Sequence, residues 1–169
     1  MKATKIQKLL TRPTTHFTIK ITWLIIVFSL ISFKLHFFRH WVWLLFLAGG
    51  MVLGLMFILI DQKFLYRLYQ PQTQLTGLIS QSLMFLGVFI PLALFITTSS
   101  SSPIGIGFVI GFLTTTAVDM TRLMSNQVEF NQAYLYQFSK QFNLNQRGWI
   151  TFTFVVITGI LSLLIVVRI

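Results

Sequence analysis

Long apolar runs separated by short polar segments dominate this chain. The longest run without a charged side chain covers residues 68–118, which is 51 residues. A helix needs roughly 20 apolar residues to cross a bilayer core of about 30 Å, so this run is too long for one membrane helix and suits two. The turn-like segment 99–103, Ser-Ser-Ser-Ser-Pro, divides it. The pattern predicts a membrane hairpin with spans at about 76–97 and about 103–118.

The apolar run near the N-terminus is shorter. Only 13 uncharged residues separate Lys20 from Lys34. This run crosses a membrane only if the helix covers about 18–38 and both lysine side chains snorkel to the interface. A signal peptide is the alternative. Because no small-residue cleavage site follows the apolar core, and more basic residues come directly after it, we expect an uncleaved first span.

Two more runs have the length of a complete span. Residues 41–60 are 20 residues without a charge and begin with Trp41, and residues 148–167 contain Trp149 near their start. Tryptophan is enriched where membrane helices meet water. The sequence therefore predicts an all-α, polytopic membrane helix bundle with five transmembrane helices, or four if residues 103–118 only dip into the membrane.

Two segments differ from these spans. Residues 1–20 carry five Lys and Arg residues and no acid, and they form a basic N-terminal segment ahead of a single transmembrane domain at 18–169. Residues 123–143 carry apolar side chains at helical spacing, so we expect an amphipathic helix at the membrane surface or against a partner, ended by Asn143 and Asn145. Its expected apolar face consists of Met124, Val128, Leu135, Phe138 and Phe142.

Composition agrees with a membrane protein. Charged residues make up 9% of the chain, against about 25% in soluble domains, and the mean hydropathy is +0.80. The net charge of +10 would suggest nucleic acid in a soluble protein. No basic groove with interleaved aromatic residues is visible, so we expect lipid, and another membrane protein or a second copy, as partners and no nucleic acid. The absence of cysteine excludes disulfides, thiol catalysis and iron–sulfur ligation.

The basic residues also predict an orientation. With five spans and a cytoplasmic N-terminus, the inner segments hold 10 of the 13 Lys and Arg residues and the outer segments hold 3. If residues 103–118 do not span, the counts become 8 and 5. The positive-inside rule therefore favours five spans, with the N-terminus in the cytoplasm and the C-terminus outside. No organellar targeting pattern is present, so we expect a bacterial plasma membrane.

Glycines at helical spacing mark candidate packing faces. Gly50 and Gly54 lie four residues apart in the second span, and Gly107 and Gly111 lie four apart in the fourth, which also contains Gly105. Without a Cβ atom, two helix backbones approach closely and gain van der Waals contact, which replaces the hydrophobic effect in lipid. These faces suit packing within the monomer, or an interface with a second copy or another membrane protein.

Two polar clusters lie inside the predicted hairpin. They are Ser80, Gln81 and Ser82 in the third span, and Thr114, Thr115 and Thr116 in the fourth. Because the hairpin is antiparallel, we expect both clusters near the cytoplasmic face, where hydrogen bonds across the two helices would satisfy Gln81. The alternative is a polar lining for a substrate cavity, with Pro91 kinking the third span.

Charged side chains occur at the borders of the spans. Asp61 and Asp119 end the second and fourth spans on the predicted cytoplasmic side. Arg122, three residues after Asp119, can pair with it at the helix end. A cation site between the two carboxylates is the alternative. His36 and His40 share a helix face, but they have no third ligand nearby, so we expect no metal site.

No charged residue falls in the middle of any predicted span, and no cofactor motif or nucleophile–base pair is present. Coupled carriers and intramembrane hydrolases need such groups, so we expect no catalytic residue and no cofactor. The leading hypothesis is a non-catalytic accessory or assembly subunit. The second is a small transporter or lipid-handling protein that uses the 76–118 hairpin. The third is a membrane-embedded enzyme that uses Asp61, Asp119 or Glu129.

Overall fold

The computed structural model describes residues 13–35, 40–61, 78–138 and 142–168. Across these ranges every regular element is a helix, which confirms the all-α class. In chain order the elements are α2 (Pro13–Lys34), α3 (Trp41–Ile60), the short 3₁₀ helix η2 (Ile79–Gln81), α5 (Leu83–Ser99), α6 (Pro103–Leu123), α7 (Gln127–Tyr134) and α8 (Leu144–Arg168).

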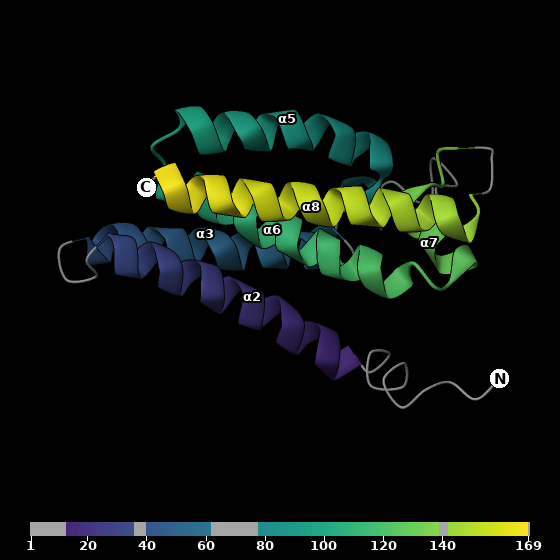
Figure 1. Cartoon of the computed structure of the whole chain (residues 1–169), viewed down its shortest axis with the longest axis horizontal. Coiled ribbons are helices and arrows are strands. Elements are labelled where there is room, and N and C mark those ends of the chain that lie inside the picture. Colours follow the sequence, from purple (N-terminus) through teal and green to yellow (C-terminus); the bar gives the residue numbers. More distant parts are fainter. Residues whose placement is uncertain (1–12, 36–39, 62–77, 139–141, 169) are drawn as a thin grey trace.

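The long helices α2, α3, α5, α6 and α8 run along one common axis (Figure 1). The chain reverses direction from each long helix to the next, so the start of α2 and the end of α8 lie at opposite ends of the bundle. The short helix α7 lies where α8 begins. We call this end of the bundle the α7 end, and we call the opposite end, where α8 finishes, the Arg168 end.

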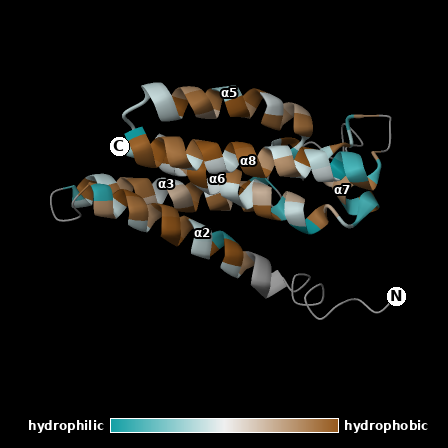
Figure 2. Cartoon of the chain, viewed as in Figure 1, coloured by the Kyte–Doolittle hydropathy of each residue, from teal (hydrophilic) through white to brown (hydrophobic). Residues whose placement is uncertain are grey.

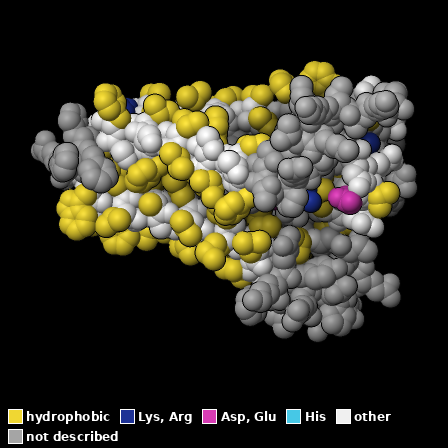
Figure 3. Space-filling model, turned by 90° about the horizontal axis from the view of Figure 1, so that it is seen from below, with side chains coloured by type: hydrophobic (Ala, Val, Ile, Leu, Met, Phe, Trp, Pro, Cys, Tyr) yellow, Lys and Arg dark blue, Asp and Glu magenta, His cyan; other side chains and the backbone are white. Residues whose placement is uncertain are grey.

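Figure 2 shows that the long helices consist mostly of hydrophobic residues. Phe33, Val88 and Val167 are 89%, 74% and 73% exposed, and in Figure 3 hydrophobic side chains are spread over the described surface outside the grey atoms, with acidic side chains visible toward the α7 end. Lipid requires such a surface, whereas soluble monomers rarely show one. Within the described ranges, four helices are long and apolar enough to cross a membrane, namely α2 from Phe17 onward, α3, α6 and α8. They indicate integration into a membrane.

The two halves of the predicted hairpin differ from the expected lengths, because the second half is longer than predicted and the first half is shorter. The segment at 103–118 does not turn back but belongs to α6, a continuous helix of 21 residues. The Ser102 hydroxyl caps this helix by accepting from the Gly105 N–H, and Pro103 follows in the first turn. The predicted span at 76–97 is the shorter one, because α5 has only 17 residues and is about 26 Å long.

The predicted surface helix at 123–143 also differs in extent and in its buried face. Within the described residues, α6 continues to Leu123 and α7 covers only eight residues. The buried side of α7 carries Phe130 and Tyr134, whereas Val128, which was expected to face the membrane or a partner, is exposed. The pattern of apolar and polar residues here is compatible with either of two buried helix faces. Packing against the bundle buries the face that carries the aromatic residues.

The helix α6 occupies the centre of the bundle. It contacts α2, α3, α5, α7 and α8, and nearly all of its side chains between Ile106 and Ala117 are buried. One group of core residues lies between α6 and α2 with α3, and a second lies between α6 and α5, α7 and α8. Every other long helix exposes one side and packs the opposite side toward α6.

Candidate functional site

The helices α3 and α6 pack backbone against backbone. Gly50 and Gly54 of α3 face α6, and Gly107 and Gly111 of α6 face α3. A Cβ atom on Gly50 would lie 2.9 Å from the carbonyl carbon of Ile104, and a Cβ on each of the other three would also lie within 3.0 Å of a backbone atom. Only glycine fits at these four positions. The two predicted packing faces therefore meet each other inside one chain.

Other glycines lie outside this contact. A Cβ atom on Gly105 would meet the Ile96 side chain of α5 at 3.4 Å, which is an ordinary van der Waals distance. Gly49, Gly87 and Gly159 have no atom within 4 Å of the place where a Cβ would stand. These three glycines face open space on α3, α5 and α8.

The polar residues ahead of α5 gather near a buried carboxylate at the α7 end. Asp61, directly after α3, is only 2% exposed. It accepts a hydrogen bond from the Ser80 N–H at 3.1 Å and another from the Ser80 hydroxyl. Gln81 and Ser82 are also buried, and the Ser82 hydroxyl accepts from the Phe85 N–H at 3.2 Å, which caps α5. Asp61 thus links the end of α3 to the start of α5.

The threonines of α6 face the interior but bond within their own helix. The Thr115 hydroxyl donates to the Gly111 carbonyl at 2.7 Å, and the Thr116 hydroxyl donates to the Phe112 carbonyl at 3.0 Å. The Thr114 hydroxyl is buried without a partner among the described residues. Across the described part of the chain, no hydrogen bond joins these threonines to Gln81, in contrast to the bond predicted across the hairpin.

Asp119 pairs with a lysine on another helix. The Lys20 amine of α2 lies 2.7 Å from the Asp119 carboxylate of α6, and the two side chains are 14% and 16% exposed. The expected partner was Arg122, three residues away in the same helix. The ion pair instead joins two helices, so the Lys20 side chain does not need to snorkel to the membrane interface. Asp61 and Asp119 bind different partners, which does not favour a shared cation site.

Two buried polar residues at the α7 end were not predicted as site residues. Arg147 of α8 is 4% exposed, and its Nη1 donates to the Met124 carbonyl at 2.8 Å. Its Nε, like the Tyr134 hydroxyl, is buried without a partner in the described ranges. The pair Asn143 and Gln146 could have indicated that Arg147 lies inside a helix. The Gln146 side chain accepts from the Asn143 N–H at 3.0 Å, a capping arrangement that starts α8 before Arg147 rather than ending a helix there.

The pKa values of two tyrosines at this end are raised. Burial is the main cause at Tyr134, whose pKa lies well above its ordinary value of 10.0, while the Asp119 carboxylate raises this pKa further and Arg122 opposes it. Burial also raises the pKa of Tyr136, and a hydrogen bond with Ser82 lowers it. Both phenols therefore remain protonated at neutral pH and are not poised to act as bases.

Basic side chains bind helix carbonyls at the Arg168 end. The Lys34 amine, at the end of α2, donates to the Val166 carbonyl of α8 at 2.9 Å. The Arg168 Nη1 donates to the carbonyls of Thr97 and of Ser100, the latter at 3.2 Å. The last carbonyls of a helix lack partners and carry the negative end of its dipole, so positive charge is favourable there. These bonds tie α2, α5 and α8 together.

Comparison with known proteins adds no homologue. No family model, curated protein or solved structure matches this chain. Among the residues that the structure describes, no three His, Asp or Glu side chains could hold one metal ion; His36 lies outside these residues. The arrangement of Asp61, Asp119 and Arg147 is that of bonds between helices.

Proposed function

We propose that this protein is an integral membrane subunit that acts by packing against another membrane protein, not by catalysis. The observation that carries this proposal is the contrast between charged side chains that are bonded inside the bundle and an exterior that is apolar. Asp61, the Lys20–Asp119 pair and Arg147 bind partners inside the bundle, whereas the long helices expose large apolar side chains. Such a chain presents apolar helix faces to a membrane partner, and its buried charged groups are not accessible to a substrate.

The proposed topology has five spans with α5 as the shortest. In support, α5 contacts both α6 and α8 and runs along the same axis as the other long helices (Figure 1). Its length of about 26 Å falls a few Å short of a typical bilayer core, a mismatch that local thinning accommodates at modest cost. Five alternating helices put the two termini on opposite sides, and the basic residues assign the α7 end to the cytoplasm.

Cysteine labelling tests this topology, because the chain contains no native cysteine. Single cysteines at Ile79, Ser101 and Ser125 flank α5 and α6, and all three positions are exposed. An impermeant maleimide added to intact cells should label only S101C, and permeabilised cells should label all three. If I79C and S101C react from the same side, α5 does not span and the five-span topology is wrong.

The proposed partner surface lies on α5 and α8. The bond from Arg168 to the Thr97 carbonyl aligns the ends of these two helices, which run in the same direction. Gly87 lies ten residues before Thr97 and Gly159 lies nine before Arg168, so both glycines lie at similar depth. A neighbouring helix from another protein could approach closely at both, since neither has an atom within 4 Å of its missing Cβ.

Crosslinking in the native membrane tests the proposed function. A tagged chain should recover another membrane protein in near-equal amount, and G87L or G159L should reduce this recovery without lowering the thermal stability of the chain itself. G105L, which faces Ile96 inside the chain, serves as a control for crowding within the monomer. Recovery of a lone monomer, together with intact membrane complexes after deletion of the gene, would overturn the proposal.

The transporter hypothesis finds less support. The Pro91 side chain is exposed on α5, and Gln81 is buried near the bonds between Asp61 and Ser80. A Gln81-dependent flux of a solute or lipid across vesicles would be needed to favour this hypothesis over a packing role.

A further inference from the structure

Two adjoining pockets lie at the Arg168 end of the bundle. The first has a volume of about 300 Å³, and its polar lining residues are His40, Trp43, Ser100, Ser101 and Arg168. The second has a volume of about 340 Å³ and is lined by His40, Trp41, Val42, Trp43, Phe46 and Pro103. Because His40 and Trp43 line both pockets, the two lie next to each other, and we call them together the depression, with a polar part and an apolar part.

The polar part is suited to an anion. Arg168 supplies a guanidinium group, of which the described bonds use only Nη1, so further N–H donors remain on the same planar group. Ser100 and Ser101 add hydroxyl groups, and Trp43 adds an indole N–H donor. Among the described residues, no Asp or Glu side chain lines this pocket. A positive group surrounded by neutral donors is the arrangement that recognises a phosphate.

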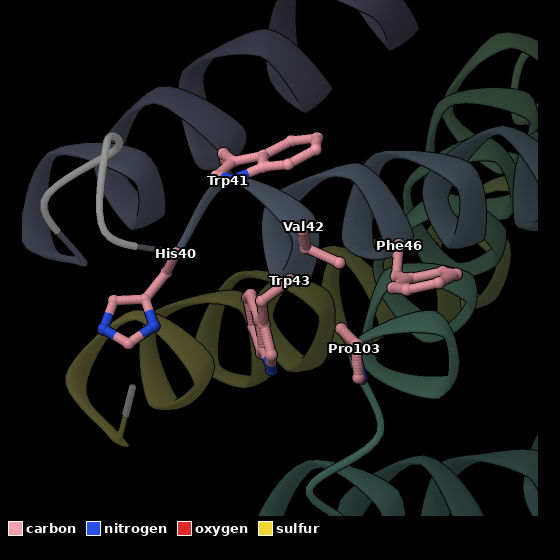
Figure 4. Close-up of a pocket in the computed structure, with 6 residues that line it drawn as sticks. All are labelled: His40, Trp41, Val42, Trp43, Phe46 and Pro103. Carbon is pink, nitrogen blue, oxygen red and sulfur yellow. The ribbon is translucent and has the colours of Figure 1, made fainter.

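The apolar part is suited to a hydrocarbon chain. Figure 4 shows Trp43 between His40 and Pro103, with Phe46 beyond Pro103, so the apolar wall continues from the start of α3 to the start of α6. Val42 and Phe46 lie one helical turn apart and extend this wall along α3, away from the Arg168 end. The polar part therefore sits at the end of the bundle, and the apolar part leads inward along it, as the headgroup and the acyl chain of a lipid do.

We infer that this depression binds one anionic phospholipid. The phosphate lies against Arg168 and the hydroxyl of Ser101, and the glycerol and first part of an acyl chain lie against Trp43, Phe46 and Pro103. Tryptophans at this end fit the headgroup level of a bilayer. A free phosphate ion shares the chemistry of the polar part but would not use the apolar part, which is why a lipid is the occupant that fits both.

Quenching of tryptophan fluorescence tests the site in purified full-length protein. The protein would be placed in phosphatidylcholine nanodiscs and titrated with brominated phosphatidylglycerol, whose bromine atoms quench nearby indoles. We expect saturable quenching at low phosphatidylglycerol content, and little change when the same amount of brominated phosphatidylcholine is added. Replacing Trp43 with Phe should remove part of the saturable quenching, because Trp43 lines both pockets, and Trp41, which lines only the apolar part, should account for the rest.

Variants separate lipid binding from folding. Arg168 also caps helix ends, so R168Q alone could disturb the bundle. Ser101 is exposed between α5 and α6, and S101D should weaken phosphatidylglycerol binding about tenfold by placing a carboxylate against the phosphate. The matched control is S99D, which adds the same charge two residues away at a position that does not line the pocket.

Each outcome bears on the inference. Selective quenching by phosphatidylglycerol that S101D weakens and S99D preserves supports it. Two results together would show an anion site without a lipid preference and would overturn the inference. The first is displacement of the lipid by millimolar inorganic phosphate, and the second is unchanged lipid binding in a W43F or F46A variant. Equal quenching by the neutral and the anionic lipid would also overturn it. None of these results depends on whether a protein partner is recovered by crosslinking.

Discussion

The central helix α6 makes two contacts of different kinds with α3 and with α5. Against α3 it packs backbone to backbone, through Gly50 and Gly54 on one side and Gly107 and Gly111 on the other. Against α5 it packs through aromatic side chains, with the rings of Phe89 and Phe112 4.6 Å apart in an edge-to-face arrangement. The helix that directly precedes α6 in the chain is therefore the more distant neighbour.

This difference shows what determines the distance between two packed helices in such a bundle. Lipid tails are as apolar as Leu or Phe side chains, so burying an apolar side chain against another helix gains little from the hydrophobic effect. Close contact between many atoms supplies the attraction instead. Glycine permits that contact at four positions of α3 and α6, whereas the short connection between α5 and α6 only makes these two helices neighbours.

The largest predicted effect comes from adding one methyl group at the α3–α6 contact. G50A should destabilise the protein by about 3 kcal/mol, the upper end for overpacking, because the new Cβ meets the Ile104 backbone rather than a movable side chain. G49A, one residue earlier, meets nothing within 4 Å and should stabilise the helix by up to about 1 kcal/mol. Thermal unfolding in one detergent measures both changes.

The two substitutions differ only in which face of α3 receives the methyl group. Opposite signs would establish that closeness to α6, not helix propensity, decides the outcome. A similar stability change at both positions would contradict the backbone contact and would require α3 and α6 to lie farther apart.

Much of the helical pattern could be predicted from the sequence, because length and apolarity of a run are local properties. The span at 41–60 matches α3 in both bounds, and the two glycine pairs were recognisable from their spacing of four. The sequence did not indicate that these pairs face each other, since their spacing says nothing about which helix lies opposite. The shortness of α5 was also hidden, because residues 78–82 are uncharged but contain the 3₁₀ helix η2 and end at the Ser82 cap.

The partners of the charged residues were harder to predict. Arg122 lies near Asp119 in the chain, yet the ion pair joins Asp119 to Lys20, 99 residues away. Sequence spacing identifies pairs within one helix and cannot rank them against partners on a neighbouring helix. The burial of Arg147 was missed for a related reason, because a basic residue ahead of an apolar run is usually a border residue at the interface.

The second prediction concerns the Lys20–Asp119 pair, a third kind of contact made by α6. Breaking a fully buried pair costs about 3–5 kcal/mol and breaking an exposed one costs under about 1 kcal/mol. These two side chains are mostly buried, so K20M should cost about 2 kcal/mol, since the Asp119 carboxylate loses its partner. The double variant K20M/D119N should recover part of this loss, because no charge is then left unpaired.

A double-mutant cycle in the same detergent measures the coupling between these residues. Equal and additive losses from K20M and D119N would mean that the pair contributes nothing to holding α2 on α6. In that case the contact between α2 and α6 would depend only on apolar side chains, as the contact of α5 does.

The smallest predicted effect tests the aromatic contact between α5 and α6. F89L removes the edge-to-face packing on Phe112 but keeps most of the apolar volume, so it should cost only about 1 kcal/mol. F95L, on the exposed side of the same helix, should cost nearly nothing because lipid surrounds both side chains equally well. A loss at F89L as large as that of G50A would abolish the distinction between the two contacts, since side-chain packing would then hold α5 as firmly as backbone contact holds α3. A smaller loss would mean that side-chain packing holds α5 less firmly than backbone contact holds α3.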